Sequence, residues 1–197
     1  MREIALFDFD GTITTKDTFI EFTKYSVGDI KFFLGVLYLS PMLIAFKLKL
    51  IPNYKAKEYM LSYFFKGIEE DKFKELATNY SLNKIDNIVR KRALQEIKQH
   101  KKNGVKVVIV SASIECWLKP WCKRENLELI STKLEFINGK FSGRLLTKNC
   151  YGIEKVNRIK EQYNLKEFKT IYGYGDSSGD KDMLSISTKS YYKPFRD

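Results

Sequence analysis

The chain has 197 residues, 44% of them hydrophobic and 30% charged, and its formal net charge at pH 7 is +11. This length suits one domain, or a core with a small insertion, and the apolar fraction is large enough for a buried core. The three cysteines lack metal-ligand spacing, and there is one histidine, His100. A Cys–His or Ser–His nucleophile would depend on that histidine alone, so catalytic groups are to be sought among the carboxylates.

His100 itself lies in the charged run 98–102, which is typical of a solvated helix end rather than of a catalytic base. The first residues show no signal-peptide pattern, so a reducing cytoplasm is the expected location. No internal repeat or low-complexity tract divides the chain.

Residues 1–7 have the composition of a hydrophobic strand, and Asp8, Asp10 and a Gly-Thr turn follow it. Because residues i and i+2 of a strand point to the same face, both carboxylates should face one pocket. Two such acids can divide the work of phosphoryl transfer, one attacking phosphorus while the other exchanges protons with the leaving group and water. The alternative interpretation of this pair is a polar turn with no catalytic role.

Helix-like patterning fills the long segment that follows, residues 15–85, and nothing in it is typical of a strand. The patterned segments are residues 19–25, 30–49, 54–66 and 70–81. The sequence therefore predicts an all-helical insertion.

Within this insertion, residues 32–46 form an uncharged run of 15 residues, flanked by Lys31, Lys47 and Lys49. A membrane-spanning helix needs about 20 apolar residues, and Pro41 would kink this one. One interpretation is an apolar surface that enters the lipid interface, with its basic flanks facing anionic headgroups. The other is a pair of short helices buried against Tyr59, Met60, Phe64 and Phe65.

Strand patterns return after the insertion. Residues 105–110 are a β-branched run typical of a buried strand, and they lead into Ser111-Ala112-Ser113. Residues 133–146 alternate in strand fashion around Asn138-Gly139, which is a strong signal for a β-hairpin. Residues 190–192 are predicted to form an edge strand.

Two further polar groups follow the hairpin. Lys155 lies in the predicted first turn of a helix, and the strand pattern of residues 170–175 ends at two acids, Asp176 and Asp180. Each has an ordinary alternative, since a helix lysine is commonly a surface charge and paired acids can cap the next helix.

Apolar strands and helices alternate over residues 1–14 and 86–197, which predicts an α/β fold with a doubly wound, mainly parallel sheet. We therefore expect a catalytic core made of these two segments and a helical cap made of residues 15–85. Ligands of such sheets bind beyond the carboxyl ends of the strands, where Asp8, Ser111 and Asp176 fall.

Taken in order, these motifs resemble those of the haloacid dehalogenase-like (HAD) superfamily. Residues 8–12, DFDGT, are similar to its motif I, Ser111 to motif II, Lys155 to motif III and residues 176–180 to motif IV. The resemblance implies a Rossmannoid core and phosphoryl transfer through an aspartyl-phosphate. It implies Asp8 as nucleophile and Asp10 as general acid/base, and phosphate binding by Gly11, Thr12, Ser111, Ala112 and Lys155.

A magnesium ion is expected at this site. A phosphate dianion about 4 Å from an anionic Asp8 is repelled by roughly 4 kcal/mol at an effective dielectric near 20, and Mg²⁺ removes that barrier. By resemblance, its ligands are the Asp8 carboxylate, the backbone carbonyl of Asp10 and the side chain of Asp176. Asp180 is expected behind these ligands or near Lys155.

An all-helical insertion at this position resembles the C1-type cap of subclass IB, the group that contains phosphoserine phosphatase. In that enzyme the acid nine positions after the nucleophile helps to bind the substrate's amino group, and here that position is Asp17. The alternative is that Asp17 caps the helix starting at Thr18. Ser178 and Gly179 depart from the phosphoserine-type motif IV, which argues against phosphoserine. The form of residues 150–155 and 172–177 is similar to phosphatidylglycerophosphatase C.

We therefore expect a Mg²⁺-dependent phosphomonoester hydrolase whose substrate is either a small phosphorylated metabolite or a lipid headgroup phosphate such as phosphatidylglycerophosphate. The chain carries 35 Lys and Arg against 24 Asp and Glu. This surplus would suit a polyanionic substrate or an anionic membrane, so peripheral membrane contact through residues 32–46 is an open alternative to a purely cytoplasmic location. Nucleic acid is not expected, and the oligomeric state stays open.

The alternative function is a catalytically silent membrane-binding or scaffold protein with the same fold. It predicts the loss of Asp8, Asp10, Lys155 or Asp176, yet all four are present. Asp10 also argues against a dehalogenase, which needs no second acid there.

Overall fold

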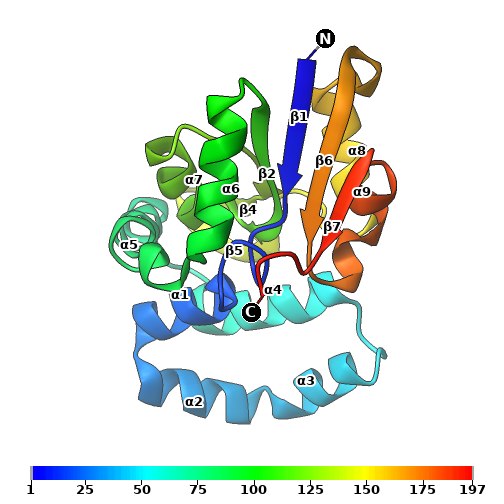
Figure 1. The fold of residues 1–197 in the computed structure, drawn as a ribbon. Coiled ribbons are helices and arrows are strands. Elements are labelled where there is room, and N and C mark those ends of the chain that lie inside the picture. The colour runs from blue at the N-terminus through cyan, green and yellow to red at the C-terminus, as the bar shows by residue number, and fades with distance from the viewer. Residues whose placement is uncertain (1, 197) are drawn as a thin grey trace.

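A central parallel sheet organises residues 2–196, which are the residues that the structure, a computed structural model, describes. In spatial order, its strands within these residues are β3 (Glu128–Thr132), β2 (Lys106–Ile114), β1 (Arg2–Phe7), β6 (Phe168–Gly175) and β7 (Lys189–Tyr192). Each neighbouring pair runs parallel, and Figure 1 shows the carboxyl ends of β1 and β6 pointing toward the same end of the molecule. The predicted α/β fold class is confirmed, and so is the edge strand at residues 190–192.

Helices cover both faces of this sheet. The buried residues of α6 (Lys91–Lys102) and α7 (Glu115–Arg124) share one hydrophobic core with Ala5 and Phe7 of β1. Those of α8 (Ile153–Gln162) and α9 (Lys181–Ser185) share a second core with Ile4 and Leu6. A strand that is buried on both faces is continuously apolar rather than alternating, as residues 4–7 are.

The insertion consists of α1 (Thr18–Val27), α2 (Asp29–Tyr38), α3 (Ser40–Lys47), α4 (Asn53–Phe65) and α5 (Glu70–Asn83). In Figure 1, α1 and α4 lie across the carboxyl end of the sheet, and α2 and α3 form a layer farther from it. Helix α5 packs instead beside α7 of the core. Short 3₁₀ turns complete the chain at Ile85–Ile88, Leu165–Glu167 and Ser178–Asp180.

The helical pattern predicted over residues 30–49 is divided into two helices, α2 and α3, whose axes differ by 66°. The break falls at Leu39, directly before a helix that carries Pro41 in its first turn. Proline is tolerated there because it has no N–H to donate, whereas inside one continuous helix it would clash with the preceding turn. Among the described residues, no single helix is long and apolar enough to cross a membrane, although α2 and α3 together would meet that criterion as a bent pair.

The hairpin predicted at residues 133–146 is confirmed as β4 (Leu134–Ile137) and β5 (Lys140–Leu145). Its turn has positive φ at both Asn138 and Gly139, as a type I′ turn requires. The hairpin packs on the insertion, because the Leu145 N–H donates to Glu58 of α4 at 2.9 Å. It thereby joins the core segment to the helices of the insertion.

The prediction that His100 is a solvated helix end is wrong. Its ring is buried, and Nε2 lies 2.8 Å from the Tyr174 hydroxyl oxygen and 3.4 Å from Glu96 Oε1. The reason is helical spacing, since Ala93, Ile97 and His100 fall on the one face of α6 that is buried. The neighbouring lysines occupy the opposite, exposed face.

Candidate active site

The predicted acids converge where two neighbouring strands end. Asp8 follows β1 and Asp176 follows β6, while Asp180 lies at the end of a short turn after β6. One carboxylate oxygen from each of these three residues lies within 4.8 Å of the other two. The structure thus brings together side chains that are more than 160 positions apart in the chain.

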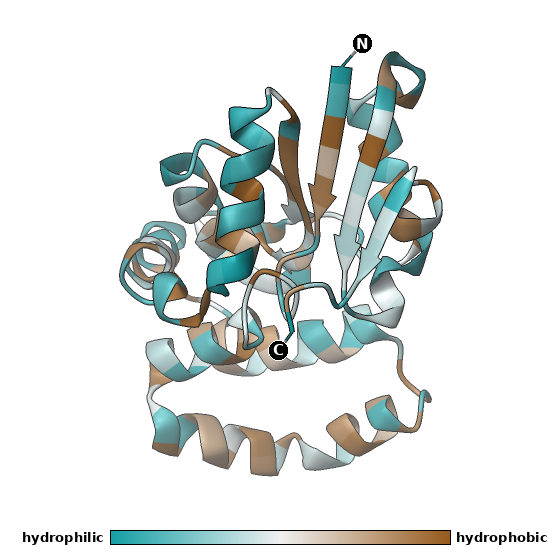
Figure 2. Cartoon of the chain, viewed as in Figure 1, coloured by the Kyte–Doolittle hydropathy of each residue, from teal (hydrophilic) through white to brown (hydrophobic). Residues whose placement is uncertain are grey.

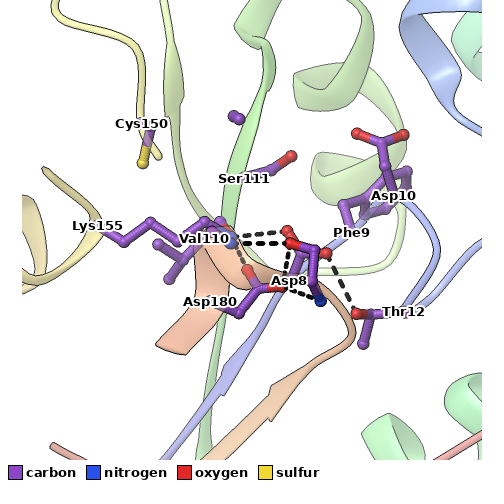
Figure 3. Close-up of polar contacts among 12 residues, drawn as sticks. Asp8, Phe9, Asp10, Thr12, Val110, Ser111, Cys150, Lys155 and Asp180 are labelled. Carbon is purple, nitrogen blue, oxygen red and sulfur yellow. Dashed lines mark hydrogen bonds and ion pairs between the residues drawn. The ribbon is translucent and has the colours of Figure 1, made fainter. Parts of the chain in front are cut away.

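Lys155 is the cation at the centre of this cluster, and Figure 3 shows its contacts. Its Nζ donates to Asp8 Oδ1 at 2.6 Å, to Asp180 Oδ1 at 2.7 Å and to the Val110 carbonyl at 2.7 Å. The side chain is 2% exposed, and a lysine so deeply buried requires close anionic partners. Lys155 therefore fixes the position of Asp8 from the first turn of α8.

The charges in this cluster influence one another strongly. Burial raises the pKa of Asp8 to about 7, although the Lys155 ammonium opposes that rise. Burial also favours neutral forms of Lys155 and Asp180. The charges of Asp8 and then Asp180 outweigh it for Lys155, whose pKa is raised, and the Lys155 ammonium outweighs it for Asp180, whose pKa is lowered. The Lys155–Asp180 pair thus stays ionised, and Asp8 is the carboxylate whose charge is least favoured.

The Gly11-Thr12 turn closes over the acids. Gly11 has a φ of +81°, and a Cβ atom there would lie 2.5 Å from Asp176 Oδ2, so the position requires glycine. The Thr12 hydroxyl lies 3.1 Å from Asp8 Oδ2 and 3.3 Å from Asp176 Oδ1. The turn thereby links the two carboxylates that belong to different strands.

Asp10 points away from Asp8, toward the start of α1 (Figure 3). It accepts hydrogen bonds from the Thr18 N–H at 2.6 Å and from the Ser113 hydroxyl at 2.5 Å. Burial raises its pKa to about 6, nearby Asp17 adds to the rise, and these two hydrogen bonds limit it. A carboxyl group with a pKa near neutrality is suited to giving and taking protons.

The Ser111-Ala112-Ser113 segment lies at the end of β2. Ser111 is fully buried, and its hydroxyl accepts the Ser113 N–H at 3.0 Å. Ala112 and Ser113 line the cavity beside the acids. Sequence reasoning singled out Ser111 and missed Ser113, whose signal was a second hydroxyl two residues along the same strand.

A cavity of about 400 Å³ separates the acids from the insertion. Its core side is polar and includes Asp8, Asp10, Lys155, Asp176 and Asp180. Its opposite side is mainly apolar and includes Phe19, Ile20, Leu43, Phe46 and Met60. The arrangement is that of a charged reaction centre beneath an apolar cover.

Lys57 of α4 is a second cation at this cavity, where it is half-buried, and sequence reasoning missed it. Its Nζ donates to the Ala112 carbonyl at 2.7 Å and to Asn149 Oδ1 at 3.0 Å. The Asn149 amide donates in turn to Asn53 Oδ1 at 2.7 Å. Burial lowers the pKa of Lys57 to about 8, although Asp17 and Asp10 oppose the fall. The sequence gave no signal for it, because nothing in the local pattern separates it from Lys55, two positions earlier, which is exposed.

Asp17 caps α1, as the sequence predicted in one of two interpretations. Its Oδ1 accepts the N–H groups of Phe19 at 2.9 Å and Ile20 at 3.2 Å. Asp17 also lines the cavity. Capping and contact with a bound molecule are therefore compatible at this position.

The donor set fits a divalent cation. Asp8, Asp176 and Asp180 supply carboxylate oxygens, the ligand type that Mg²⁺ prefers, and they outnumber the single buried lysine. Arg196, in the C-terminal segment, forms an ion pair with Asp176. Asp176 thus attracts positive charge from the side of the cluster that Lys155 does not reach.

Comparison with known proteins identifies the family. A family model for haloacid dehalogenase-like hydrolases matches residues 5–185, and the chain belongs to this family of hydrolases. Protein CicA of Caulobacter vibrioides is 32% identical over 195 residues, which cover 98% of this chain and 86% of CicA. The predicted superfamily is confirmed.

Solved structures share the fold. A protein of unknown function from Bordetella pertussis Tohama I has a TM-score of 0.84 at 20% identity, covering 96% of this chain and 89% of that one. An apo phosphoserine phosphatase has a TM-score of 0.68 at 15% identity, covering 98% of this chain and 86% of that one. The chain is thus a hydrolase with a phosphoserine phosphatase-like fold.

Proposed function

We propose that this hydrolase is a Mg²⁺-dependent phosphatase that cleaves phosphomonoesters through a phosphorylated Asp8. The observation that carries the proposal is the position of Asp8, which is buried at the cavity floor between Lys155 Nζ at 2.6 Å and the Thr12 hydroxyl at 3.1 Å. Lys155 orients the carboxylate and offsets the negative charge that gathers when a phosphate approaches.

The reaction follows from these positions. An Asp8 oxygen attacks phosphorus, the bond between phosphorus and the ester oxygen breaks, and Asp10 gives its proton to the departing oxygen. Asp10 then takes a proton from water, which attacks phosphorus, releases phosphate and regenerates Asp8. Ser113 and the Thr18 N–H hold Asp10 for both proton transfers.

The phosphoryl group would be held by groups around the floor of the cavity. These are Ala112 and Lys155, which line the cavity, with Gly11, Thr12 and Ser111 next to them in the turn after Asp8 and at the end of β2. Asp8, Asp176 and the backbone carbonyl of Asp10 would hold the metal ion, with Asp180 behind them on Lys155. When bound, the metal ion supplies positive charge that lowers the repulsion between Asp8 and the substrate.

We further propose that residues 15–85 serve as a C1-type cap of subclass IB. Lys57 and Asp17 bring charges of both signs from this cap to the cavity, and its apolar cover would exclude water during the reaction. The substrate is either a small phosphorylated metabolite or a lipid headgroup phosphate. Several solved structures that share the fold are phosphoserine phosphatases, which supports a phosphomonoester.

The test is phosphate release, with and without Mg²⁺, from a panel containing phosphoserine, sugar phosphates, nucleotides and phosphatidylglycerophosphate in vesicles. We expect Mg²⁺-dependent turnover of at least one member, and none by Asp8→Asn at equal protein concentration. Equal turnover by Asp8→Asn would exclude Asp8 as the nucleophile. No turnover of any member, with intact Mg²⁺ binding, would favour the silent scaffold.

A further inference from the structure

The outer face of α2 is apolar along its whole length. Ile30, Phe33, Leu34, Leu37 and Tyr38 follow the spacing of one helix face, and they are between 55% and 79% exposed. The surface continues beyond α2 with exposed Ile44, Leu48 and Leu50. An amphipathic helix of a water-exposed protein normally turns its polar face outward. Here the outer face is apolar instead, and Figure 2 shows hydrophobic residues along both α2 and α3 in the outermost layer.

The inner face of α2 is firmly packed, so this exposure is not the result of a detached helix. A Cβ atom on Gly35 would lie 2.4 Å from the Phe64 ring and 2.7 Å from Tyr63, so α2 touches α4 there. The Phe32 ring also stacks on Phe64 with centroids 5.9 Å apart. The interpretation of residues 32–46 as buried helices therefore holds for one face only.

The charges around this face are mainly positive. Residues 30–57 contain five lysines and no acidic residue, and the acid beside them is Asp29, the exposed first residue of α2. Four of these lysines, Lys31, Lys47, Lys49 and Lys55, are exposed. Such a border would repel the same face of a second copy, whereas it would attract a surface that is both apolar and anionic.

We propose that the outer face of α2 and α3 docks on an anionic lipid bilayer and lies in the plane of its headgroups. A helix of ten residues is only about 15 Å long, half of the roughly 30 Å of a bilayer's hydrocarbon core. Helix α2 is also held against α4 through Gly35. The exposed side chains would enter the headgroup boundary, while the lysines contact lipid phosphates.

Docking would bring the active-site cavity to the lipid surface. Leu43 and Phe46 of α3 line the cavity that contains Asp8, whereas Ile44 of the same helix is 59% exposed. One helix thus separates the reaction centre from the docking face. The position of the cavity at the membrane favours substrates whose phosphate is presented there. This consequence rests on the proposed function, whereas docking itself does not.

The test is co-sedimentation with vesicles of phosphatidylcholine alone or mixed in equal parts with phosphatidylglycerol. We expect the full chain to bind the anionic vesicles and not the neutral ones, with weaker binding at high salt. The double variant Phe33→Ser/Leu37→Ser, which changes side chains that are 67% and 61% exposed, should bind at least about tenfold more weakly. Lys47→Glu/Lys49→Glu should also weaken binding without touching the apolar side chains.

Two control variants make the same kinds of substitution at exposed positions outside α2 and α3. Ile137→Ser/Leu146→Ser removes two exposed side chains of the hairpin region, and Lys98→Glu/Lys102→Glu reverses two exposed charges of α6. Both should bind vesicles as the unaltered chain does. Equal binding by all five proteins, or binding to neither vesicle, would overturn the proposal. The proposal would also be overturned if the unaltered chain bound no vesicles but formed a dimer, and the Phe33→Ser/Leu37→Ser variant were monomeric.

The same samples are assayed with p-nitrophenyl phosphate, a small ester that needs no membrane. The variants Phe33→Ser/Leu37→Ser and Lys47→Glu/Lys49→Glu should hydrolyse it at the rate of the unaltered chain, because none of the four side chains lines the cavity. Vesicle binding without hydrolysis would contradict the proposed function and leave docking intact. Hydrolysis without vesicle binding would contradict docking and leave the function intact.

Discussion

At the scale of single residues, Lys155 is the group on which the reaction centre depends most. Lys155→Met keeps much of its length but leaves Asp8 and Asp180 without the ammonium that lies 2.6 and 2.7 Å from them. We expect kcat to fall about 1,000-fold and the free energy of unfolding to fall by about 3 kcal/mol. Lys160→Met, at an exposed position of the same helix, should change neither. Normal turnover by Lys155→Met would contradict its role.

Ser113 should act by positioning Asp10, and a comparison of substrates with good and poor leaving groups tests this. Ser113→Ala removes the hydroxyl that donates to Asp10 at 2.5 Å, so protonation of a poor leaving group should suffer. We expect the rate of Asp8 phosphorylation, measured as the burst of released alcohol or phenol, to fall about tenfold for an alkyl phosphate. For p-nitrophenyl phosphate, whose leaving group needs no proton, the same rate should change little.

Two further variants serve as comparisons for Ser113→Ala. Asp10→Asn should show the same selectivity with a larger loss, because it removes the acid itself. Ser111→Ala should impair both substrates alike, because its proposed role is to hold the phosphoryl group. An equal loss on both substrates in Ser113→Ala would show that Ser113 does not position the acid.

At the scale of elements, Lys57 holds α4 against the core. Lys57→Met would leave the Ala112 carbonyl and Asn149 Oδ1 to share the single proton of the Thr132 hydroxyl, their other donor, at a cost of about 1–3 kcal/mol. We expect faster hydrogen exchange in α4 and a KM about tenfold higher for phosphorylated substrates. Lys55→Met, at an exposed position of the same helix, is the control. Unchanged exchange and KM in Lys57→Met would show that the contact is dispensable.

Elements with a local signal were predicted from the sequence. The strand before Asp8, the hairpin around Asn138-Gly139 and the edge strand at 190–192 are each set by composition or turn chemistry within a few residues. Asp8 and Asp176 could be placed together because parallel strands end at one edge of the sheet. Lys155 was placed with them by its resemblance to motif III of the superfamily.

Features that depend on long-range packing were not predicted. Lys57 becomes an active-site residue only because α4 crosses the sheet end, and His100 is buried only because its helix face meets Tyr174 of β6. The exposure of α2 was undecided for the same reason. An apolar run has the same composition whether its outer face is covered or free.

At the scale of the whole molecule, burial of His100 should make stability depend on pH. Burial lowers its pKa below the ordinary 6.5, although Glu96 and Glu3 oppose the shift. The unfolded chain therefore binds a proton that the folded chain binds less readily, so stability contributed by His100 is complete above about pH 6.5 and declines as the pH falls below it. The decline is at most about 1.4 kcal/mol per pH unit.

Urea unfolding at several pH values between about 8 and about 5 measures the free energy of unfolding of the unaltered chain and of His100→Gln. The glutamine can still bond to the Tyr174 hydroxyl but cannot titrate. We expect the variant to lose less stability than the unaltered chain below about pH 6.5. If the free energy of unfolding depended on pH in the same way in both proteins, His100 would not be the source of the pH dependence.

The formation of phosphorylated Asp8 is tested most directly by trapping it. The enzyme is quenched in acid during turnover of p-nitrophenyl phosphate with Mg²⁺, digested, and analysed by mass spectrometry. We predict one phosphoryl group on the peptide that contains Asp8, removed by hydroxylamine as an acyl phosphate is, and absent from Asp8→Asn. A phosphoryl group on another residue, or unimpaired turnover by Asp8→Asn, would contradict the mechanism.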